Sequence, residues 1–293
     1  MRKIILIFTL LTIGSNISYG QIIDMHMHSY TEKDFWVGTA RNGLKSSKSA
    51  KETLEQTIQK MNEHNIEYAV VCGSIESIEL YSKTDKRFIP AYQDYEEELI
   101  PINKFEDYIK SGKIKVFGEV MAVYKGKTLT DSIYQPYLAV CEKYGIPVGY
   151  HSGGSFPNAQ QLGWPNYRIS LGDPFLIEDV LVKFPKLKLY LMHAGENFYE
   201  NTLRMMDGYP NLHADLGVEM WLHPMTKDFA VKFLKSAKEY GFLDRVMFGS
   251  DQMVWPNAIT NSIDFLNDLD FLTKEEKELI FYKNAKKFLS IEE

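Results

Sequence analysis

The chain has 293 residues, of which 45% are hydrophobic and 25% are charged, an ordinary globular composition. This composition excludes a disordered chain, a collagen-like repeat and a membrane protein with many spans. The formal net charge is −6 and no run of five or more basic residues occurs, so we expect neither nucleic acid nor an anionic membrane as the main partner.

Residues 1–20 have the pattern of a secretory signal peptide. Two basic residues precede a ten-residue apolar run (4–13), and Ser18 and Gly20 supply small side chains just before Gln21. The apolar run is too short to span a bilayer, and no cysteine follows the predicted cleavage point to carry a lipid anchor. We therefore expect an exported protein, periplasmic or secreted. It would begin at Gln21 and carry a charge of −8, because both basic residues leave with the leader.

The two cysteines, Cys72 and Cys141, do not indicate a disulfide framework, because a chain of this length buries a large core without cross-links. Export would permit a disulfide between them. Both lie in apolar stretches, however, which favours buried free thiols.

After the leader, β-rich runs alternate with helical patterns. The eight candidate strands are Ile22–His28, Glu67–Ser74, Arg87–Ala91, Lys113–Met121, Ile146–His151, Lys186–His193, Asn211–Leu216 and Arg245–Ser250. Helix signals lie between them, such as the proline after Asp173 and the capping box from Thr273 to Glu276. A doubly wound sheet usually has fewer strands and a glycine-rich turn after the first, which is absent here. We therefore expect one α/β domain over residues 21–293, a (β/α)8 TIM barrel.

Histidines and carboxylates gather at the carboxyl ends of the predicted strands, which open into one shared mouth. They are His26 and His28 on strand one, Glu119 on strand four, His151 on strand five, His193 on strand six and Asp251 after strand eight. A single strand-terminal histidine is usually a packed residue, but four of the seven histidines fall at these ends. Imidazole and carboxylate suit zinc and similar divalent ions. Six such groups exceed one tetrahedral site, so we expect two adjacent ions bridged by Glu119 and a hydroxide.

Three segments resemble the amidohydrolase superfamily, specifically its amidohydrolase-related (amidohydrolase 2) group. Residues 23–28 (IDMHMH) look like its strand-one signature, residues 173–195 are similar to its fifth helix and sixth strand, and residues 248–251 (FGSD) are similar to its strand-eight ending. Many members carry a carboxylated lysine on strand four. Here Glu119 stands in that place, as in the superfamily's metal-dependent deoxyribonucleases.

The resemblance implies how the predicted ligands are divided between two ions. One ion would be held by His26, His28 and Asp251, and the second by His151 and His193. A metal-bound water would attack a carbonyl or phosphoryl centre. Asp251 would be the catalytic residue that takes the water proton and passes it to the leaving group. Asp24 would support the ligands rather than touch substrate.

The strand-to-helix loops carry the predicted substrate contacts. The loop 152–172 is long and contains Trp164 and Arg168, whose guanidinium would clamp a substrate carboxylate or form a surface salt bridge. Tyr124 follows strand four and His223 follows strand seven. The aromatic residues of these loops suit a sugar-derived or aromatic compound, or pack the loops against the barrel.

We therefore expect a metal-dependent hydrolase that uses a metal-activated water to cleave an ester, lactone or amide bond of a small organic substrate. The cofactor would be one or two divalent ions, with zinc expected. The alternatives are a metal-dependent decarboxylase of an aromatic acid and a non-catalytic periplasmic protein that binds metal or a ligand. The charge of the exported chain argues against a polyanionic substrate such as nucleic acid. No membrane anchor is expected, and a homo-oligomer is compatible with these features.

Overall fold

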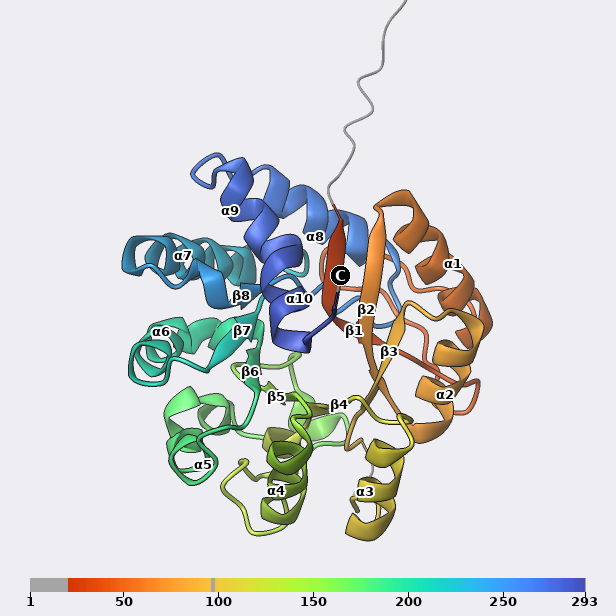
Figure 1. The fold of residues 1–293 in the computed structure, drawn as a ribbon. Coiled ribbons are helices and arrows are strands. Elements are labelled where there is room, and N and C mark those ends of the chain that lie inside the picture. Colours follow the sequence, from red (N-terminus) through yellow and green to blue (C-terminus); the bar gives the residue numbers. More distant parts are fainter. Residues whose placement is uncertain (1–20, 96–97, 293) are drawn as a thin grey trace, which may run out of the picture.

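The computed structural model describes residues 21–95 and 98–292, so the predicted signal peptide lies outside the described residues. Eight parallel strands follow one another in chain order around a nearly closed barrel (Figure 1). The strands are β1 (Ile22–His28), β2 (Ile66–Gly73), β3 (Phe88–Tyr92), β4 (Val116–Val120), β5 (Val148–His151), β6 (Leu189–Met192), β7 (His213–Asp215) and β8 (Val246–Met247). The predicted (β/α)8 barrel is confirmed.

Helices surround the barrel on its outside (Figure 1). They are α1 (Ala50–Glu63), α2 (Ile75–Thr84), α3 (Ile102–Lys110), α4 (Gln135–Tyr144), α5 (Glu178–Lys183), α6 (Tyr199–Gly208), α7 (Pro224–Tyr240), α8 (Asn257–Asn267), α9 (Lys274–Glu278) and α10 (Asn284–Leu289). The capping box predicted at Thr273 and Glu276 begins α9. Asp173 caps as predicted, but it begins a 3-10 turn that leads into α5. Over the described residues, the helices are all too short or too polar to cross a bilayer.

The barrel closes where β1 meets the segment after β8. The Met25 amide donates to the Phe248 carbonyl (2.9 Å), and the Asp251 amide donates to the His26 carbonyl (2.6 Å). The Phe248 amide donates to Ile280 (2.9 Å) rather than to β7. Because the backbone leaves the β7 ladder there, β8 is two residues long and shorter than the predicted strand. These bonds hold Asp251 beside the histidines of β1.

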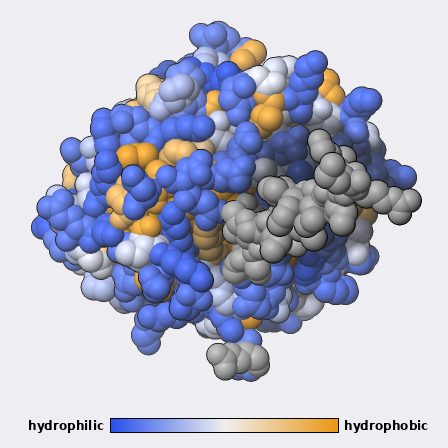
Figure 2. Space-filling view, turned by 90° about the horizontal axis from the view of Figure 1, so that it is seen from above, coloured by the Kyte–Doolittle hydropathy of each residue, from blue (hydrophilic) through white to orange (hydrophobic). Residues whose placement is uncertain are grey.

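Apolar side chains fill the barrel below its mouth. Met25, Cys72 and Tyr190 belong to this inner cluster, and α10 covers the end of the barrel opposite the mouth. The ring of Phe288 on α10 lies 5.7 Å from that of Tyr190 and 4.5 Å from that of His213. Cys72 and Cys141 are buried free thiols, as predicted. The face seen in Figure 2 is mainly hydrophilic, with smaller apolar areas between the polar side chains.

Candidate metal centre

The six predicted ligands converge at the mouth of the barrel. They come from β1, β4, β5, from the residue just after β6, and from the turn after β8. Each is at most 7% exposed, so the cluster is almost closed to solvent. Because the carboxyl ends of the barrel strands share one mouth, residues that are spread over more than two hundred positions of the chain come together in space.

His26, His28 and Asp251 form the first group that could hold an ion. The Asp251 Oδ1 atom lies 2.9 Å from His28 Nε2 and 3.7 Å from His26 Nε2. Zinc–nitrogen distances of about 2.0–2.1 Å place two ligands of one tetrahedral ion roughly 3.4 Å apart. The spacing of this group therefore suits one shared cation, and it is the group expected from the sequence.

The second group differs from the expected pair. It comprises His26, Glu119 and His193, so His26 is common to both groups. Glu119 Oε1 lies 3.3 Å from His193 Nε2, and Glu119 Oε2 lies 4.0 Å from His26 Nε2. His151 reaches this group through its Nδ1 atom, which lies 2.5 Å from Glu119 Oε1 and 3.1 Å from His193 Nε2. Glu119 is thus a member of the second group and lies beside His26, the residue common to both groups.

Three of the histidines face an oxygen atom with the nitrogen that points away from the centre. His151 and His193 make hydrogen bonds there to the carbonyls of Gly154 (2.9 Å) and Gly217 (3.0 Å), and His26 Nδ1 makes an ion-pair contact with Asp215 Oδ2 (3.3 Å). An acceptor there favours a proton on the outer nitrogen and leaves the lone pair of the inner nitrogen directed at the centre. This arrangement fits a divalent cation.

The cluster balances its charges internally. Burial opposes ionisation of Glu119, but His151, His193 and His26 hold the pKa of its carboxyl well below the usual range. Burial likewise opposes ionisation of Asp251, whose pKa is lowered by the neighbouring imidazoles. Conversely, burial alone would lower the pKa of His26, but the surrounding carboxylates raise it to about 9. The carboxylates therefore favour protonated rings at His26 and His193, and a bound cation would take the place of the proton on the inner nitrogen.

Asp24 supports the ligands through the backbone, as expected. Its Oδ1 atom accepts from the amides of His26 and Ser250, both at 3.0 Å, and so ties β1 to the turn that carries Asp251. Burial raises the pKa of this carboxyl to about 7, although both amide bonds oppose that shift.

Three further polar residues that support the ligands were missed from the sequence. Gln93 donates from Nε2 to Glu119 Oε2 (3.1 Å). Gln252 accepts from the His28 amide and donates to the His28 carbonyl, both at 2.8 Å. Asp215 is the third, and it ends β7. All three lie at or just after the carboxyl end of a strand, so the rule that found the ligands was also the signal for these residues.

Two of the predicted substrate contacts lie beside the cluster. The ring of Tyr124 is 4.8 Å from that of His151, and the ring of Trp164 is 5.1 Å from that of Tyr124. Ser155 donates a hydrogen bond to the Tyr124 hydroxyl (2.8 Å), and burial raises the pKa of that hydroxyl well above its usual value. These rings form an aromatic wall next to the histidines.

The other two predicted contacts have local partners. Arg168 is exposed, and its guanidinium donates to the carbonyls of Pro165 (2.9 Å) and Tyr167 (2.7 Å) in its own loop. His223 caps α7, and its Nδ1 accepts from the Met225 amide (3.2 Å). Their roles toward a substrate stay predictions.

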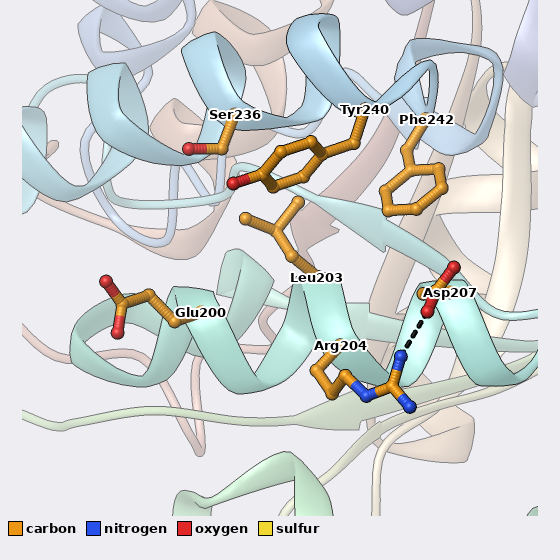
Figure 3. A pocket seen from close by; sticks show the side chains of 7 residues that line it. All are labelled: Glu200, Leu203, Arg204, Asp207, Ser236, Tyr240 and Phe242. Carbon is orange, nitrogen blue, oxygen red and sulfur yellow. Dashed lines mark hydrogen bonds and ion pairs between the residues drawn. The ribbon is translucent and has the colours of Figure 1, made fainter.

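A hollow of about 560 Å³ lies away from the mouth, between α6 and the end of α7 (Figure 3). Its lining residues are Glu200, Leu203, Arg204, Asp207, Ser236, Tyr240 and Phe242. It contains none of the predicted ligands or substrate contacts.

The barrel and its histidine–carboxylate cluster define the class: a TIM-barrel protein whose mouth could hold a divalent cation. The chain belongs to the amidohydrolase family, whose sequence profile matches residues 23–291. Among proteins with curated functions, none matches this chain.

Solved structures share the fold at low sequence identity. An uncharacterized TIM-barrel protein from Bordetella bronchiseptica is 21% identical, with a TM-score of 0.68 over 92% of this chain and 98% of that one. A probable 2-pyrone-4,6-dicarboxylic acid hydrolase from Acinetobacter baumannii is 16% identical, with a TM-score of 0.65 over 92% and 99%. A 2,6-dihydroxybenzoate decarboxylase from Rhizobium is 15% identical, with a TM-score of 0.60 over 93% and 99%. These likenesses establish the fold, and proteins named as hydrolases and decarboxylases are among those that share it.

Proposed function

We propose that this protein is a metal-dependent hydrolase that cleaves an ester, lactone or amide bond of a small organic substrate. The observation that carries the proposal is the orientation of the cluster: inner nitrogens and carboxylate oxygens face one another, while the outer nitrogens of His151 and His193 bind backbone carbonyls and that of His26 faces the Asp215 carboxylate. This arrangement leaves lone pairs directed at one small volume.

A divalent cation held there, for which zinc is our first candidate, would acidify a water molecule and polarise a substrate carbonyl. Asp251 belongs to the first group, and the neighbouring imidazoles lower the pKa of its carboxyl, so we assign to its carboxylate the role of accepting a proton and passing it to a leaving group. Tyr124 and Trp164 would bind an apolar or planar part of the substrate against the edge of the cluster.

Decarboxylation of an aromatic acid is the second candidate, and the aromatic wall favours it. Tyr124 lies between His151 and the rings of Trp164 and Phe156, the latter 6.4 Å away. A flat aromatic acid would stack on such a wall with its carboxylate toward the cluster. A structural neighbour is named as a decarboxylase of such an acid, 2,6-dihydroxybenzoate.

We further propose that the protein acts outside the cytoplasm on a small molecule. The support is the leader pattern of residues 1–20 and the charge of −8 that remains without it, which disfavours a polyanionic substrate. N-terminal sequencing of the exported protein would test the cleavage site before Gln21. A retained leader would overturn it.

Elemental analysis of the purified protein tests the metal centre. We expect about two ions per chain in the parent, falling to one or none in Glu119→Ala, because the bridging carboxylate is lost. Glu55→Ala is the matched control, since Glu55 is an exposed residue of α1 that should leave the metal content unchanged. An unchanged count in Glu119→Ala would refute its bridging role.

Product analysis distinguishes the reactions. Metal-loaded protein would be incubated with lactones, esters, amides, phosphoesters and aromatic acids in ¹⁸O-labelled water. Hydrolysis places ¹⁸O in the organic product, whereas release of carbon dioxide with no ¹⁸O in the remaining organic product would support the decarboxylase. Tight binding of one compound without turnover of any would identify a binding protein instead.

A further inference from the structure

We infer that Asp215, the last residue of β7, is a positioning residue that fixes the imidazole of His26 for metal binding. This inference rests on the proposed metal centre and goes beyond it, since Asp215 is not itself one of the predicted ligands. His26 belongs to both candidate ion groups, so a residue that controls its ring controls both.

The carboxylate of Asp215 connects β7 to two ligands at once. Its Oδ2 atom lies 3.3 Å from His26 Nδ1, the nitrogen that faces away from the centre. Its Oδ1 atom accepts from the backbone amides of His193 (3.0 Å) and Gly217 (2.8 Å). Asp215 is fully buried, so water does not compete for these contacts.

Asp215 differs in charge from the acceptors behind the other histidines. His151 and His193 are held by neutral backbone carbonyls, those of Gly154 and Gly217. A carboxylate holds the proton on Nδ1 more strongly than a carbonyl does, and it makes the opposite nitrogen a better electron donor. His26 Nε2 is therefore the imidazole nitrogen of these three that its surroundings prepare most strongly for a cation.

Two glycines leave the space in which this pair lies. A Cβ atom at Gly217 would stand 2.5 Å from His26 Nδ1 and 3.2 Å from Asp215 Oδ1. A Cβ atom at Gly249 would stand 2.9 Å from His26 Cβ and 3.2 Å from Asp215 Cγ. Contacts this close exclude a side chain at either position without displacement of the pair, so the chain is built around the Asp215–His26 contact.

The substitution Asp215→Asn separates positioning from simple packing. Asparagine has nearly the same shape, and its Oδ1 can still accept from the two backbone amides. Its amide nitrogen then faces His26 Nδ1 as a donor, so the neutral ring must carry its proton on Nε2 instead. A proton on Nε2 blocks the lone pair that faces both ion groups.

Zn²⁺ is the probe, titrated into metal-free protein in competition with a chromophoric chelator. We expect Asp215→Asn to bind it about 10- to 100-fold more weakly than the parent while the circular dichroism spectrum is retained. The ¹⁵N NMR signals of the His26 ring should report protonated Nδ1 in the zinc-loaded parent. In Asp215→Asn the neutral ring should carry its proton on Nε2.

Asp94→Asn is the matched control. Asp94 is also a buried aspartate near the mouth, but it accepts from the Met121 amide, Tyr134 and Lys125 rather than from a predicted ligand. We expect this variant to lose stability and to keep its Zn²⁺ affinity within about twofold. Equal losses of affinity in both variants would assign the effect to general destabilisation and overturn the inference.

Gly217→Ala is a second perturbation of the His26 ring, because it keeps the Asp215 carboxylate but places a methyl group 2.5 Å from His26 Nδ1 and 3.1 Å from the Cβ atom of Asp251. It should also weaken Zn²⁺ binding. Parental affinity in a folded Asp215→Asn protein, with the proton still on Nδ1, would overturn this inference alone. A parent that binds no Zn²⁺ would overturn the proposed metal centre as well, so the two failures are distinguishable.

Discussion

At the mouth of the barrel His26 is buried among three carboxyl groups, whereas at the opposite end His213 begins β7 away from the cluster. Burial lowers the pKa of an imidazole at both places. For His26, Asp251, Asp215 and Glu119 outweigh burial and raise the pKa to about 9. For His213 burial prevails, and the pKa falls to about 4. The difference between the two histidines is therefore the set of carboxylates from other strands that faces His26 at the mouth.

The two ends of the barrel also differ in the backbone conformation of their turns. At the mouth, residues with side chains adopt positive φ angles, among them His193 (64°), Val218 (58°) and Asp251 (49°). Turns at the other end place Asn65 (55°) and Gly145 (66°) in that region, residue types that adopt it at little cost. Strained residues of this kind cost on the order of 1–3 kcal/mol each and persist where the surroundings hold them. The strained backbone at the mouth therefore lowers stability while it positions the predicted ligands.

The largest effect is expected at the mouth, from Asp251→Asn. This variant keeps the shape of the side chain but loses a proton acceptor, so turnover of the substrate found by product analysis should fall about 10²- to 10⁴-fold. Steady-state kinetics would measure this loss, with thermal melts to verify the fold. Asp228→Asn, on the exposed face of α7, is the control. Near-parental turnover would remove Asp251 as the proton shuttle.

Phe288→Ala tests the opposite end. Loss of this ring, which packs on Tyr190 and His213, should lower the free energy of unfolding by about 3–5 kcal/mol. Chemical denaturation measures the change. Metal content of the folded variant should equal that of the parent, because no ligand touches the ring. A fall in metal content would show that the two ends are coupled and would weaken the comparison.

His213 also predicts a pH dependence of stability at that end. Its folded pKa of about 4 lies below the ordinary value of 6.5, so between these values the unfolded chain binds more protons. The contribution of His213 to the free energy of unfolding is therefore fully present above about pH 6.5. It falls by roughly 1–3 kcal/mol as the pH drops toward 4. The measurement is the free energy of unfolding of the parent minus that of His213→Gln across this range. A difference that stays constant with pH would contradict the assignment.

The convergence of the six predicted ligands at the mouth could be predicted because it depends on only two local rules. Side chains alternate along a strand, and the carboxyl ends of barrel strands share one mouth. The same rule places Asp215 at the mouth, but it does not identify His26 as its partner, because that contact joins β7 to β1, strands that are not neighbours in the sheet. That His26 belongs to both candidate groups appears only in the folded arrangement, and the predicted division of the ligands between two ions stays a prediction.

The loop residues show a different limit. Arg168 lies in a long loop, and its guanidinium binds two carbonyls of that loop. A sequence shows that a guanidinium is available but not which oxygen it meets, because loop conformation depends on tertiary packing. Tyr124 was more predictable, since it follows β4 by only a few residues and the strand fixes its approach to His151.

The smallest effect is expected on the outer layer, at the hollow between α6 and α7. Arg204 and Asp207 form an ion pair there, and their side chains are 70% and 57% exposed. Solvent screens such a pair, so Arg204→Ala should change the free energy of unfolding by less than about 0.5 kcal/mol and leave the metal content unaltered. Lys51→Ala on α1 removes a similarly exposed pair and serves as the reference. A loss of stability well above that of Lys51→Ala would contradict this expectation. It would mean that the aliphatic part of the Arg204 side chain stabilises the protein by packing on Leu203 in the lining of the hollow, and not by its charge.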